Sequence, residues 1–189
     1  EKILHTEIIA KSWYGLAFSS DEKFLYASGG NDNRIIKYAI QSNKLVLKDS
    51  ILLGKKWPTK ISPAGICIDS KKNILYVVTK DNNSLYSINL ATKKIKKQIN
   101  LGAEAYSCIL SPDKKELYIS LWGGDKVVVY DTQKETISNS ISVGDNPNEL
   151  CLSKSGKWLY VSNANDNSVS VIEIRKRIVI ETLDAALFP

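Results

Sequence analysis

An internal repeat constrains this chain more than any other feature of its sequence. Four segments share a Leu-Tyr pair followed by small or β-branched residues, and the tyrosines stand at positions 26, 76, 118 and 160. Their spacings are 50, 42 and 42 residues, and the longer first interval contains Lys55-Lys56-Trp57-Pro58. A period of about 40 residues is typical of architectures in which each repeat forms one structural unit.

Each repeat divides into four short stretches separated by turn-forming residues. The first stretch, such as Gly65-Ile66-Cys67-Ile68, is apolar on both faces, as expected of a strand buried on both sides. The second holds the Leu-Tyr pair and ends in residues such as Asn165-Asp166-Asn167, which tolerate the positive φ of tight hairpins. The third alternates in polarity, and the fourth is more polar. The pattern predicts an all-β fold, a β-propeller with four four-stranded antiparallel blades in this chain.

The repeats also predict the domain organisation. Residues 1–10 resemble the outer strand of a preceding blade, so the chain is expected to begin within a blade. The complete blades are expected at 11–54, 55–102, 103–144 and 145–189, all within one propeller domain. An open arc of four blades would leave apolar faces in water, and large exposed apolar patches favour association. We therefore expect further blades, or another chain, to close the ring.

Charge and hydropathy exclude two classes of partner. The net charge is +6, but the 26 Lys and Arg occur along every repeat without an aromatic-rich RNA motif or a basic helix, so no nucleic acid partner is predicted. The run Lys93-Lys94-Ile95-Lys96-Lys97 suits an outer strand with one solvated face. No apolar stretch reaches the roughly 18 residues of a spanning helix, so no membrane span is predicted.

Residues suited to metal binding or catalysis are sparse. The three cysteines, Cys67, Cys108 and Cys151, lack CxxC spacing, and His5 is the single histidine, which excludes the usual Cys/His zinc site. Alignment places Cys108 one residue out of phase with the other two, so we expect three unpaired cysteines that serve as small buried residues. The run Asn31-Asp32-Asn33 does not match a calcium loop. We predict no catalytic residue, no metal site and no cofactor in this chain.

Candidate binding residues come from the loops that gather around the channel of a propeller. The loops before each first strand and between the second and third strands supply Tyr14, Trp57, Tyr106, Trp122 and Asn163. Trp122 either stacks on a ligand or partner domain, or packs over a neighbouring blade. Trp57 either forms a domain contact or pins its own surface loop.

The repeat resembles that of YVTN-type bacterial propellers, which are related to surface-layer proteins. The residues that carry this resemblance are Leu159-Tyr160-Val161-Ser162-Asn163 and Asp166-Asn167-Ser168-Val169-Ser170-Val171-Ile172. More narrowly, the chain is similar to the propeller half of bacterial proteins that join such a module to a phosphoesterase of the alkaline-phosphatase superfamily. The narrower markers are Tyr14-Gly15-Leu16-Ala17-Phe18, Ser28-Gly29-Gly30, Trp122-Gly123-Gly124, Val143-Gly144 and Asn146-Pro147-Asn148.

This resemblance implies a seven-bladed ring, a phosphoesterase domain as partner, and a periplasmic or secreted location. The metal ligands and the nucleophile of those proteins belong to the other domain, and no residue of this chain matches them.

One departure from the family concerns the turn after the innermost strand. Family repeats place glycine there, but only Gly156 does so in this chain, and Glu22, Lys72 and Lys114 occupy the matching positions. A non-glycine residue in a left-handed conformation costs on the order of 1 kcal/mol. The sequence therefore leaves open whether three of the four turns keep the family geometry.

Three functions remain open at this point. The first is a non-catalytic scaffold or binding module within a larger exported phosphoesterase-type hydrolase. The second is a lactonase-like propeller hydrolase with a metal in its central channel. The third is a cell-surface propeller that binds other proteins.

Overall fold

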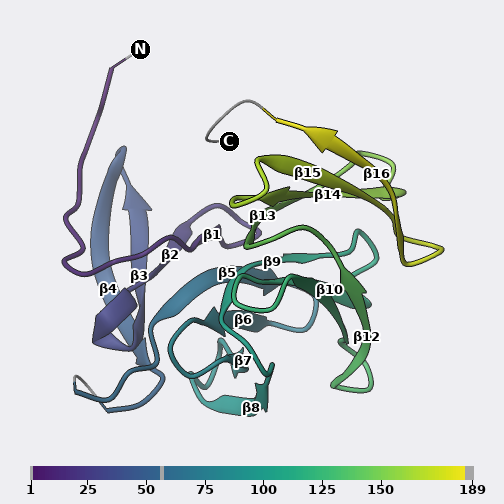
Figure 1. The fold of residues 1–189 in the computed structure, drawn as a ribbon. Helices are drawn as coiled ribbons and strands as arrows, with labels where there is room; N and C mark the ends of the chain where they lie inside the picture. Colours follow the sequence, from purple (N-terminus) through teal and green to yellow (C-terminus); the bar gives the residue numbers. More distant parts are fainter. Residues whose placement is uncertain (1, 56–57, 186–189) are drawn as a thin grey trace. The chain divides into compact units, whose positions relative to one another are not determined.

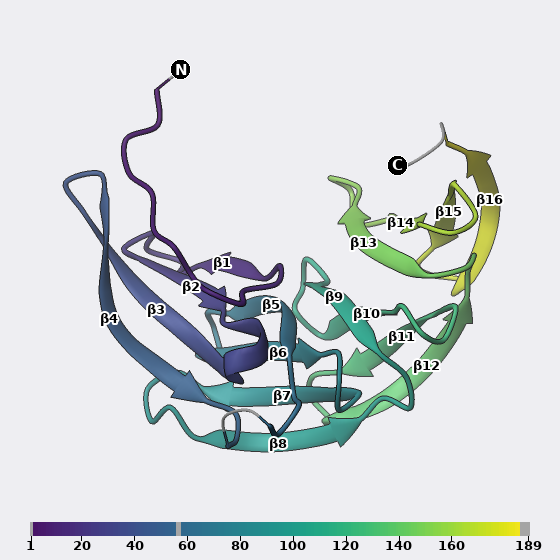
Figure 2. The ribbon, with the colours of Figure 1, turned by 60° about the vertical axis from the view of Figure 1, so that its left-hand side comes forward.

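The computed structural model describes residues 2–55 and 58–185, which form two compact units, 1–100 and 101–189. Each unit contains two sheets of four antiparallel strands, and in each sheet neighbouring strands follow one another along the chain (Figures 1 and 2). The predicted all-β propeller fold is confirmed, and we call the four sheets blades 1 to 4. Among the described residues no helix is long and apolar enough to cross a membrane.

The first unit holds blades 1 and 2. Blade 1 contains β1 (Leu16–Phe18), β2 (Phe24–Ser28), the short 3-10 helix η1 (Gly30–Asp32), β3 (Arg34–Gln41) and β4 (Lys44–Leu52). Blade 2 contains β5 (Pro63–Asp69), β6 (Ile74–Thr79), β7 (Ser84–Asn89) and β8 (Ile95–Asn100).

The second unit holds blades 3 and 4. Blade 3 contains β9 (Ala105–Leu110), β10 (Glu116–Leu121), β11 (Lys126–Asp131) and β12 (Thr136–Ser142). Blade 4 contains β13 (Pro147–Leu152), β14 (Trp158–Asn163), β15 (Ser168–Glu173) and β16 (Ile178–Asp184).

The repeated Leu-Tyr pair sets one register in every blade. In the second strand of each blade the tyrosine lies opposite one residue of the first strand and one residue of the third, and Tyr76, for example, pairs with Cys67 and Ser87. The leucines Leu75, Leu117 and Leu159 are fully buried. Because side chains alternate across a strand, this register presents one apolar face of the blade to its neighbour.

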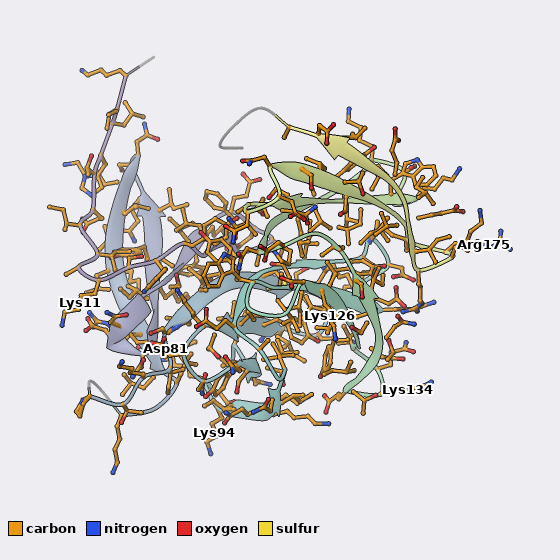
Figure 3. All side chains as sticks on the ribbon, in the orientation of Figure 1. Lys11, Asp81, Lys94, Lys126, Lys134 and Arg175 are labelled. Carbon is orange, nitrogen blue, oxygen red and sulfur yellow. The ribbon has the colours of Figure 1, made fainter. Side chains whose placement is uncertain are left out.

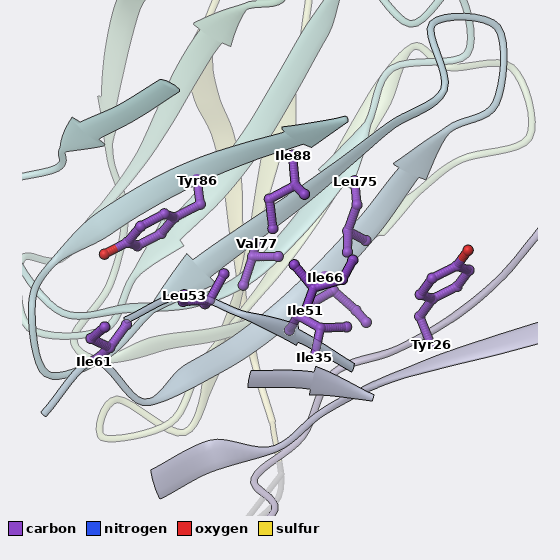
Figure 4. Packing of buried hydrophobic residues seen from close by; sticks show 10 residues of the cluster. All are labelled: Tyr26, Ile35, Ile51, Leu53, Ile61, Ile66, Leu75, Val77, Tyr86 and Ile88. Carbon is purple, nitrogen blue, oxygen red and sulfur yellow. The ribbon is translucent and has the colours of Figure 1, made fainter. Parts of the chain in front are cut away.

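Blades 1 and 2 pack through apolar residues from every strand except the edge strand β8 (Figure 4). Tyr26, Ile35 and Ile51 of blade 1 face Ile66 and Leu75 of blade 2 in one continuous cluster. In the second unit a matching cluster joins Tyr118, Val127, Val129 and Ile141 of blade 3 to Leu150, Leu159, Val161 and Ile172 of blade 4. Each such contact removes large β-branched and aromatic side chains from water, which is the main force that holds neighbouring blades together.

The outer faces of β1 and β13 differ from the prediction that the innermost strands are buried on both sides. Leu16 and Phe18 of β1 are 64% and 59% exposed, and Glu149 and Cys151 of β13 are exposed. No blade of the same unit packs on these two faces.

The exposure of the three cysteines depends on whether a neighbouring blade covers them. Cys108 is buried and Cys67 is half-buried, but Cys151 is exposed on the uncovered face of β13. The expectation of three buried cysteines is therefore wrong for Cys151. None of the three forms a disulfide, as predicted.

The segment before blade 1 does not form a strand in the structure. Residues 2–9 have no strand partner among the described residues, and Ile3, Leu4 and Ile8 are largely exposed. Ile9 packs against the cluster of Ala27, Ile36 and Tyr38 on blade 1. A strand needs a hydrogen-bonded neighbour, so the assignment of residues 1–10 to a preceding blade stays a prediction.

The turns after the innermost strands keep a left-handed residue in all four blades. Glu22, Lys114 and Gly156 have φ of 54°, 61° and 67°. In blade 2 the left-handed residue is Asn73, with φ of 53°, and not Lys72. Asparagine tolerates this conformation, so blade 2 avoids most of the strain that Glu22 and Lys114 carry. The left-handed turn residue is therefore kept in all four blades, and in blade 2 it lies one residue later than expected.

This geometry predicts that Lys114→Gly stabilises the protein. Glycine adopts φ of about 60° without a Cβ clash, so we expect the free energy of unfolding to rise by about 0.5–1 kcal/mol. Lys72→Gly is the matched control, because Lys72 has no positive φ and glycine there only adds freedom to the unfolded chain. Urea unfolding of both variants checks the prediction, and equal effects from the two substitutions would contradict it.

Candidate functional site

Asn33 ties the loop that enters blade 2 to the hairpin of blade 1. It lies at the end of η1 with φ of 53° and is fully buried. Its Nδ2 donates to the carbonyl oxygens of Lys55 at 2.8 Å and Thr59 at 2.5 Å. Its Oδ1 accepts the backbone N–H groups of Ile61 and Ser62, each at 3.1 Å. One amide therefore fixes both ends of this loop.

Beside Asn33, polar and aromatic side chains form the loop face of the first unit. Trp13 Nε1 donates to Asn31 Oδ1 at 3.2 Å, and Ser62 Oγ donates to Asp81 Oδ2 at 2.5 Å. Lys80 Nζ lies 4.6 Å from the centroid of the Trp13 ring, a cation–π distance. Trp13 is 47% exposed. The face thus presents an indole next to an ammonium and a carboxylate.

The second unit builds its loop face around Asn146. The Nδ2 of Asn146 donates to the Trp122 carbonyl at 2.8 Å, and its backbone N–H donates to Asp125 Oδ1 at 3.2 Å. The N–H of Asp145 donates to Asp166 Oδ2 at 2.7 Å. These bonds hold the hairpins of blades 3 and 4 against the loop between the blades.

A serine hydroxyl of the second strand accepts a backbone N–H at the start of the innermost strand in three blades. Ser28 accepts it from Gly15 at 3.0 Å, Ser120 from Ser107 at 3.0 Å and Ser162 from Glu149 at 3.1 Å. In blades 3 and 4 the register of the strand pair also shifts at this point. Blade 2 has a similar shift between Pro63 and Ile66 but carries Val78 at the equivalent position, so the shift does not require the serine.

Glu149 is the carboxylate on an innermost strand of the second unit. Ser107 Oγ donates to Glu149 Oε1 at 3.3 Å, which links the first strands of blades 3 and 4. Partial burial of the carboxyl raises the pKa of Glu149 above its ordinary value. The shift means that the folded protein holds the Glu149 proton more tightly than the unfolded chain does.

We expect Glu149→Gln to stabilise the protein at neutral pH and to have no such effect in acid. When the pKa of a carboxyl is higher in the folded protein than in the unfolded chain, the free energy of unfolding falls as the pH rises. The fall begins near the unfolded pKa, about 4.3, and continues through the folded pKa. Glutamine removes that loss, so the gain in melting temperature should appear above this window and vanish below it. Glu181→Gln, at an exposed position of β16, removes the same charge as a control. A gain that does not change with pH would contradict the prediction.

A polar cavity of about 250 Å³ lies between blades 1 and 2, on the side opposite the hairpins. Its walls include Ser19 and Asp21 from the β1–β2 turn, Ser70 and Asn73 from the β5–β6 turn, and Lys37 from β3. Lys37 Nζ lies 3.8 Å from the centroid of the Phe24 ring. The cavity therefore offers hydroxyl groups, the Asp21 carboxylate and one held ammonium.

Groups suited to metal or acid–base chemistry do not gather in the part of the chain that the structure describes. No three His, Cys, Asp or Glu side chains in residues 2–55 and 58–185 are placed to hold a metal ion. His5 is hydrogen-bonded to Glu7 at 2.9 Å in the segment before blade 1. The arrangement of the loop faces suits binding through hydrogen bonds and aromatic contacts.

Comparison with known proteins places this geometry in a family. The sequence profile of the YNCE-like beta-propeller family matches residues 6–189. The chain belongs to the YNCE-like β-propeller family. The narrower resemblance to propellers fused to a phosphoesterase is not part of this finding.

Several known proteins are similar to this YNCE-like propeller. Antigen Lp49 of Leptospira interrogans is 27% identical over 184 residues, which cover 83% of this chain and 37% of that protein. Hydrazine synthase of Kuenenia stuttgartiensis has a similar structure, with a TM-score of 0.80 and 20% identity over 97% of this chain and 52% of the other. A protein of Bacteroides uniformis, described provisionally as a 6-phosphogluconolactonase, has a similar structure as well. Its TM-score is 0.77 and its sequence identity 14%, over 93% of this chain and 55% of the other. This YNCE-like chain thus spans between about a third and somewhat more than half of their lengths.

The predicted site residues of this YNCE-like propeller lie in different environments. Tyr14 is 39% exposed just before β1, and Tyr106 is half-buried in β9 next to Ser107. Trp122 is half-buried in the β10–β11 hairpin, where its carbonyl accepts Asn146. Asn163 is fully buried at the end of β14, and its Nδ2 donates to the hydroxyls of Ser168 and Ser170 at 2.9 Å. Trp57 lies outside the described residues.

The structure therefore brings Trp122 into a loop face and gives Asn163 a structural part in its own hairpin. The binding roles of all five residues stay predictions. Sequence reasoning passed over Trp13, Asn33 and Glu149. Trp13 stands next to Tyr14 and could have been found by its type, and Glu149 departs from the apolar pattern of the innermost strand. Nothing local distinguishes Asn33 from the other hairpin asparagines, because its partners lie more than 20 residues away.

Proposed function

We propose that this YNCE-like propeller is a non-catalytic scaffold that binds a partner through its loop faces. The observation that carries the proposal is how both loop faces are built. In each unit polar side chains are bonded to one another and to backbone beside an aromatic residue. In the first unit the indole of Trp13 is held by Asn31 and Lys80, and in the second unit the backbone carbonyl of Trp122 accepts Asn146. A fixed aromatic group with a polar surround is typical of a binding hot spot.

We further propose that additional blades of the same propeller cover the open faces of blades 1 and 4. Leu16 and Phe18 on β1 form an exposed apolar pair, whereas the innermost strands of blades 2 and 3 are mostly buried. The relatives are longer than this chain, which leaves room for such blades in the whole protein. The whole protein is then an exported hydrolase of the phosphoesterase type, periplasmic or secreted, in which the chemistry belongs to another domain.

Two alternatives keep support from single observations. The name of Antigen Lp49 favours a cell-surface propeller that contacts other proteins. The second alternative, a lactonase-like propeller with a metal in its channel, shares its fold with the Bacteroides uniformis neighbour.

The test compares metal content and hydrolysis. The full-length protein and the propeller are assayed for bound divalent metal and for turnover of phosphate monoesters, phosphate diesters and sugar lactones, with and without a chelator. The scaffold proposal expects no metal and no turnover in the propeller, and phosphoesterase activity only in the full-length protein. Stoichiometric metal in the propeller, with lactone hydrolysis that the chelator abolishes, would establish the lactonase alternative instead.

A further inference from the structure

The positive charge of the chain is concentrated in one blade. Residues 55–102, which contain blade 2, hold ten lysines and two aspartates, a net charge of +8. Because the whole chain has a net charge of +6, the remaining residues together have a net charge of −2. Basic residues occur in every repeat, as stated above, but the net charge of blade 2 and its entering loop differs from that of their neighbours.

Six of these lysines gather at one end and along one edge of blade 2, which we call the basic end. Lys71 and Lys72 lie in the β5–β6 turn, Lys93 and Lys94 in the β7–β8 turn, and Lys96 and Lys97 on β8. The two turns lie side by side, because the N–H of Leu90 donates to the carbonyl of Asn73 at 3.0 Å. Five of the six lysines are exposed and Lys97 is half-buried. Figure 3 labels Lys94 at this end.

Acidic groups close to the basic end do not cancel its charge. Asp69 is fully buried, and its Oδ1 accepts the N–H groups of Lys71 at 2.9 Å and Lys72 at 3.2 Å. In the β7–β8 turn the amide of Asn89 performs the same task without a charge, since its Oδ1 accepts the next two turn N–H groups. Asp49 on β4 forms an ion pair with Lys93, and Asp21 lines the neighbouring cavity, so three carboxylates stand against six lysines. The basic end therefore keeps a large positive excess.

The fold does not require these lysines. An outer strand needs protection against unwanted pairing, and lysine is one common means. β12, the outer strand of blade 3, has the sequence Thr-Ile-Ser-Asn-Ser-Ile-Ser and carries no charged residue. β8 carries Ile-Lys-Lys-Gln-Ile-Asn at the same place in blade 2. A solvated edge alone accordingly does not account for the charge of β8 and its neighbouring turns.

We propose that the basic end of blade 2 binds the surface of an anionic phospholipid bilayer. Clusters of four to eight basic residues attract anionic lipids through summed, long-range electrostatics. All ten basic residues in 55–102 are lysine, a compact, hydrated point charge, whereas arginine dominates where a phosphate or base is bound in one fixed geometry. Single-stranded nucleic acid binding would add stacked aromatic residues, and the turns 70–73 and 90–94 contain none.

The cavity between blades 1 and 2 opens at the same end. Ser70 and Asn73, which flank Lys71 and Lys72 in the β5–β6 turn, line its wall together with Lys37. Hydroxyl, amide and ammonium donors are the groups that phosphate oxygens accept hydrogen bonds from. The Asp21 carboxylate in the same wall would repel a phosphate, so the headgroups are expected at the exposed lysines around the mouth of the cavity and not deep inside it.

The test is co-sedimentation of the full protein with vesicles. Vesicles of phosphatidylglycerol mixed with phosphatidylcholine should bind the protein, vesicles of pure phosphatidylcholine should not, and added salt should weaken the binding. The variant Lys93→Gln, Lys94→Gln, Lys96→Gln, Lys97→Gln should bind about 100-fold more weakly or worse. The control variant Lys115→Gln, Lys126→Gln, Lys134→Gln, Lys154→Gln removes the same charge from exposed positions of the second unit and should bind within about twofold of the wild type.

Three outcomes would overturn the proposal. Equal loss in the two variants would show that net charge alone, and not the basic end, governs binding. Release from the vesicles by inorganic phosphate at constant ionic strength would assign the site to free phosphate. Tighter binding to a single-stranded oligonucleotide than to the vesicles at the same salt would assign the basic end to nucleic acid. Circular dichroism of each variant establishes that the blades are intact before binding is compared.

Discussion

Gly15→Ala should lower the free energy of unfolding by about 3 kcal/mol or more, one of the two largest effects we expect in this chain. Gly15 is buried just before β1, where blade 1 approaches blade 2. A Cβ at this position would lie 2.1 Å from the carbonyl oxygen of Ala64 and 3.1 Å from the amide nitrogen of Ile66. Both atoms belong to the backbone of β5, so relief requires a shift of one blade against the other. Urea unfolding measures the loss.

Gly123→Ala is the control for this effect. A Cβ at Gly123 would meet its nearest atoms at 3.5 Å, an ordinary contact, and neither glycine has a positive φ. Backbone entropy therefore changes alike in the two variants, and the difference between them isolates the close approach of the blades. A loss at Gly15 no greater than the loss at Gly123 would mean that blades 1 and 2 do not pack as closely as described.

Asn33→Ala should destabilise the protein by about 3–5 kcal/mol. The substitution leaves the buried N–H groups of Ile61 and Ser62 without their acceptor, at about 1–3 kcal/mol each. It also places alanine at a φ of 53°, at roughly 1 kcal/mol. The loop of residues 55–62 should loosen as well, because its tie to the hairpin of blade 1 is lost. Hydrogen exchange at Ile61 and Ser62 and the unfolding free energy provide two independent measurements.

Asn83→Ala separates backbone strain from lost hydrogen bonds. Asn83 closes the hairpin of blade 2 with φ of 52°, almost the same as Asn33. It should cost only the roughly 1 kcal/mol of the left-handed conformation. Comparable losses at the two positions would rule out the structural role of the Asn33 amide.

The strands and hairpins of this protein could be predicted because their determinants are local. The Leu-Tyr pair marks the second strand of each blade and its register, and Asn33, Asn83, Asp125 and Asn167 all close hairpins with positive φ. Each of these features depends on residues within one hairpin, and the repeat shows the same solution four times. The out-of-phase placement of Cys108 was also predictable, because strand alternation alone determines it.

The features that sequence reasoning missed depend on residues far apart in the chain. Asn33 acts on residues 22 to 29 positions away, and only the path of the loop reveals this. Cys151 is exposed because its face of blade 4 has no neighbour in the same unit. The loop faces are the least accessible to sequence reasoning, since side chains such as Trp13 and Lys80 meet through packing of successive blades and not through any spacing that a sequence shows.

The strand order within the sheets has a consequence for synthesis on the ribosome. Every strand pairs only with the strands immediately before and after it in the chain. A blade of about 40 residues can therefore complete its backbone pairing soon after it leaves the exit tunnel, without waiting for distant sequence. Until the next blade emerges, the apolar face of a newly formed blade is exposed to water. The nascent protein is therefore most prone to aggregate between the completion of one blade and the synthesis of the next.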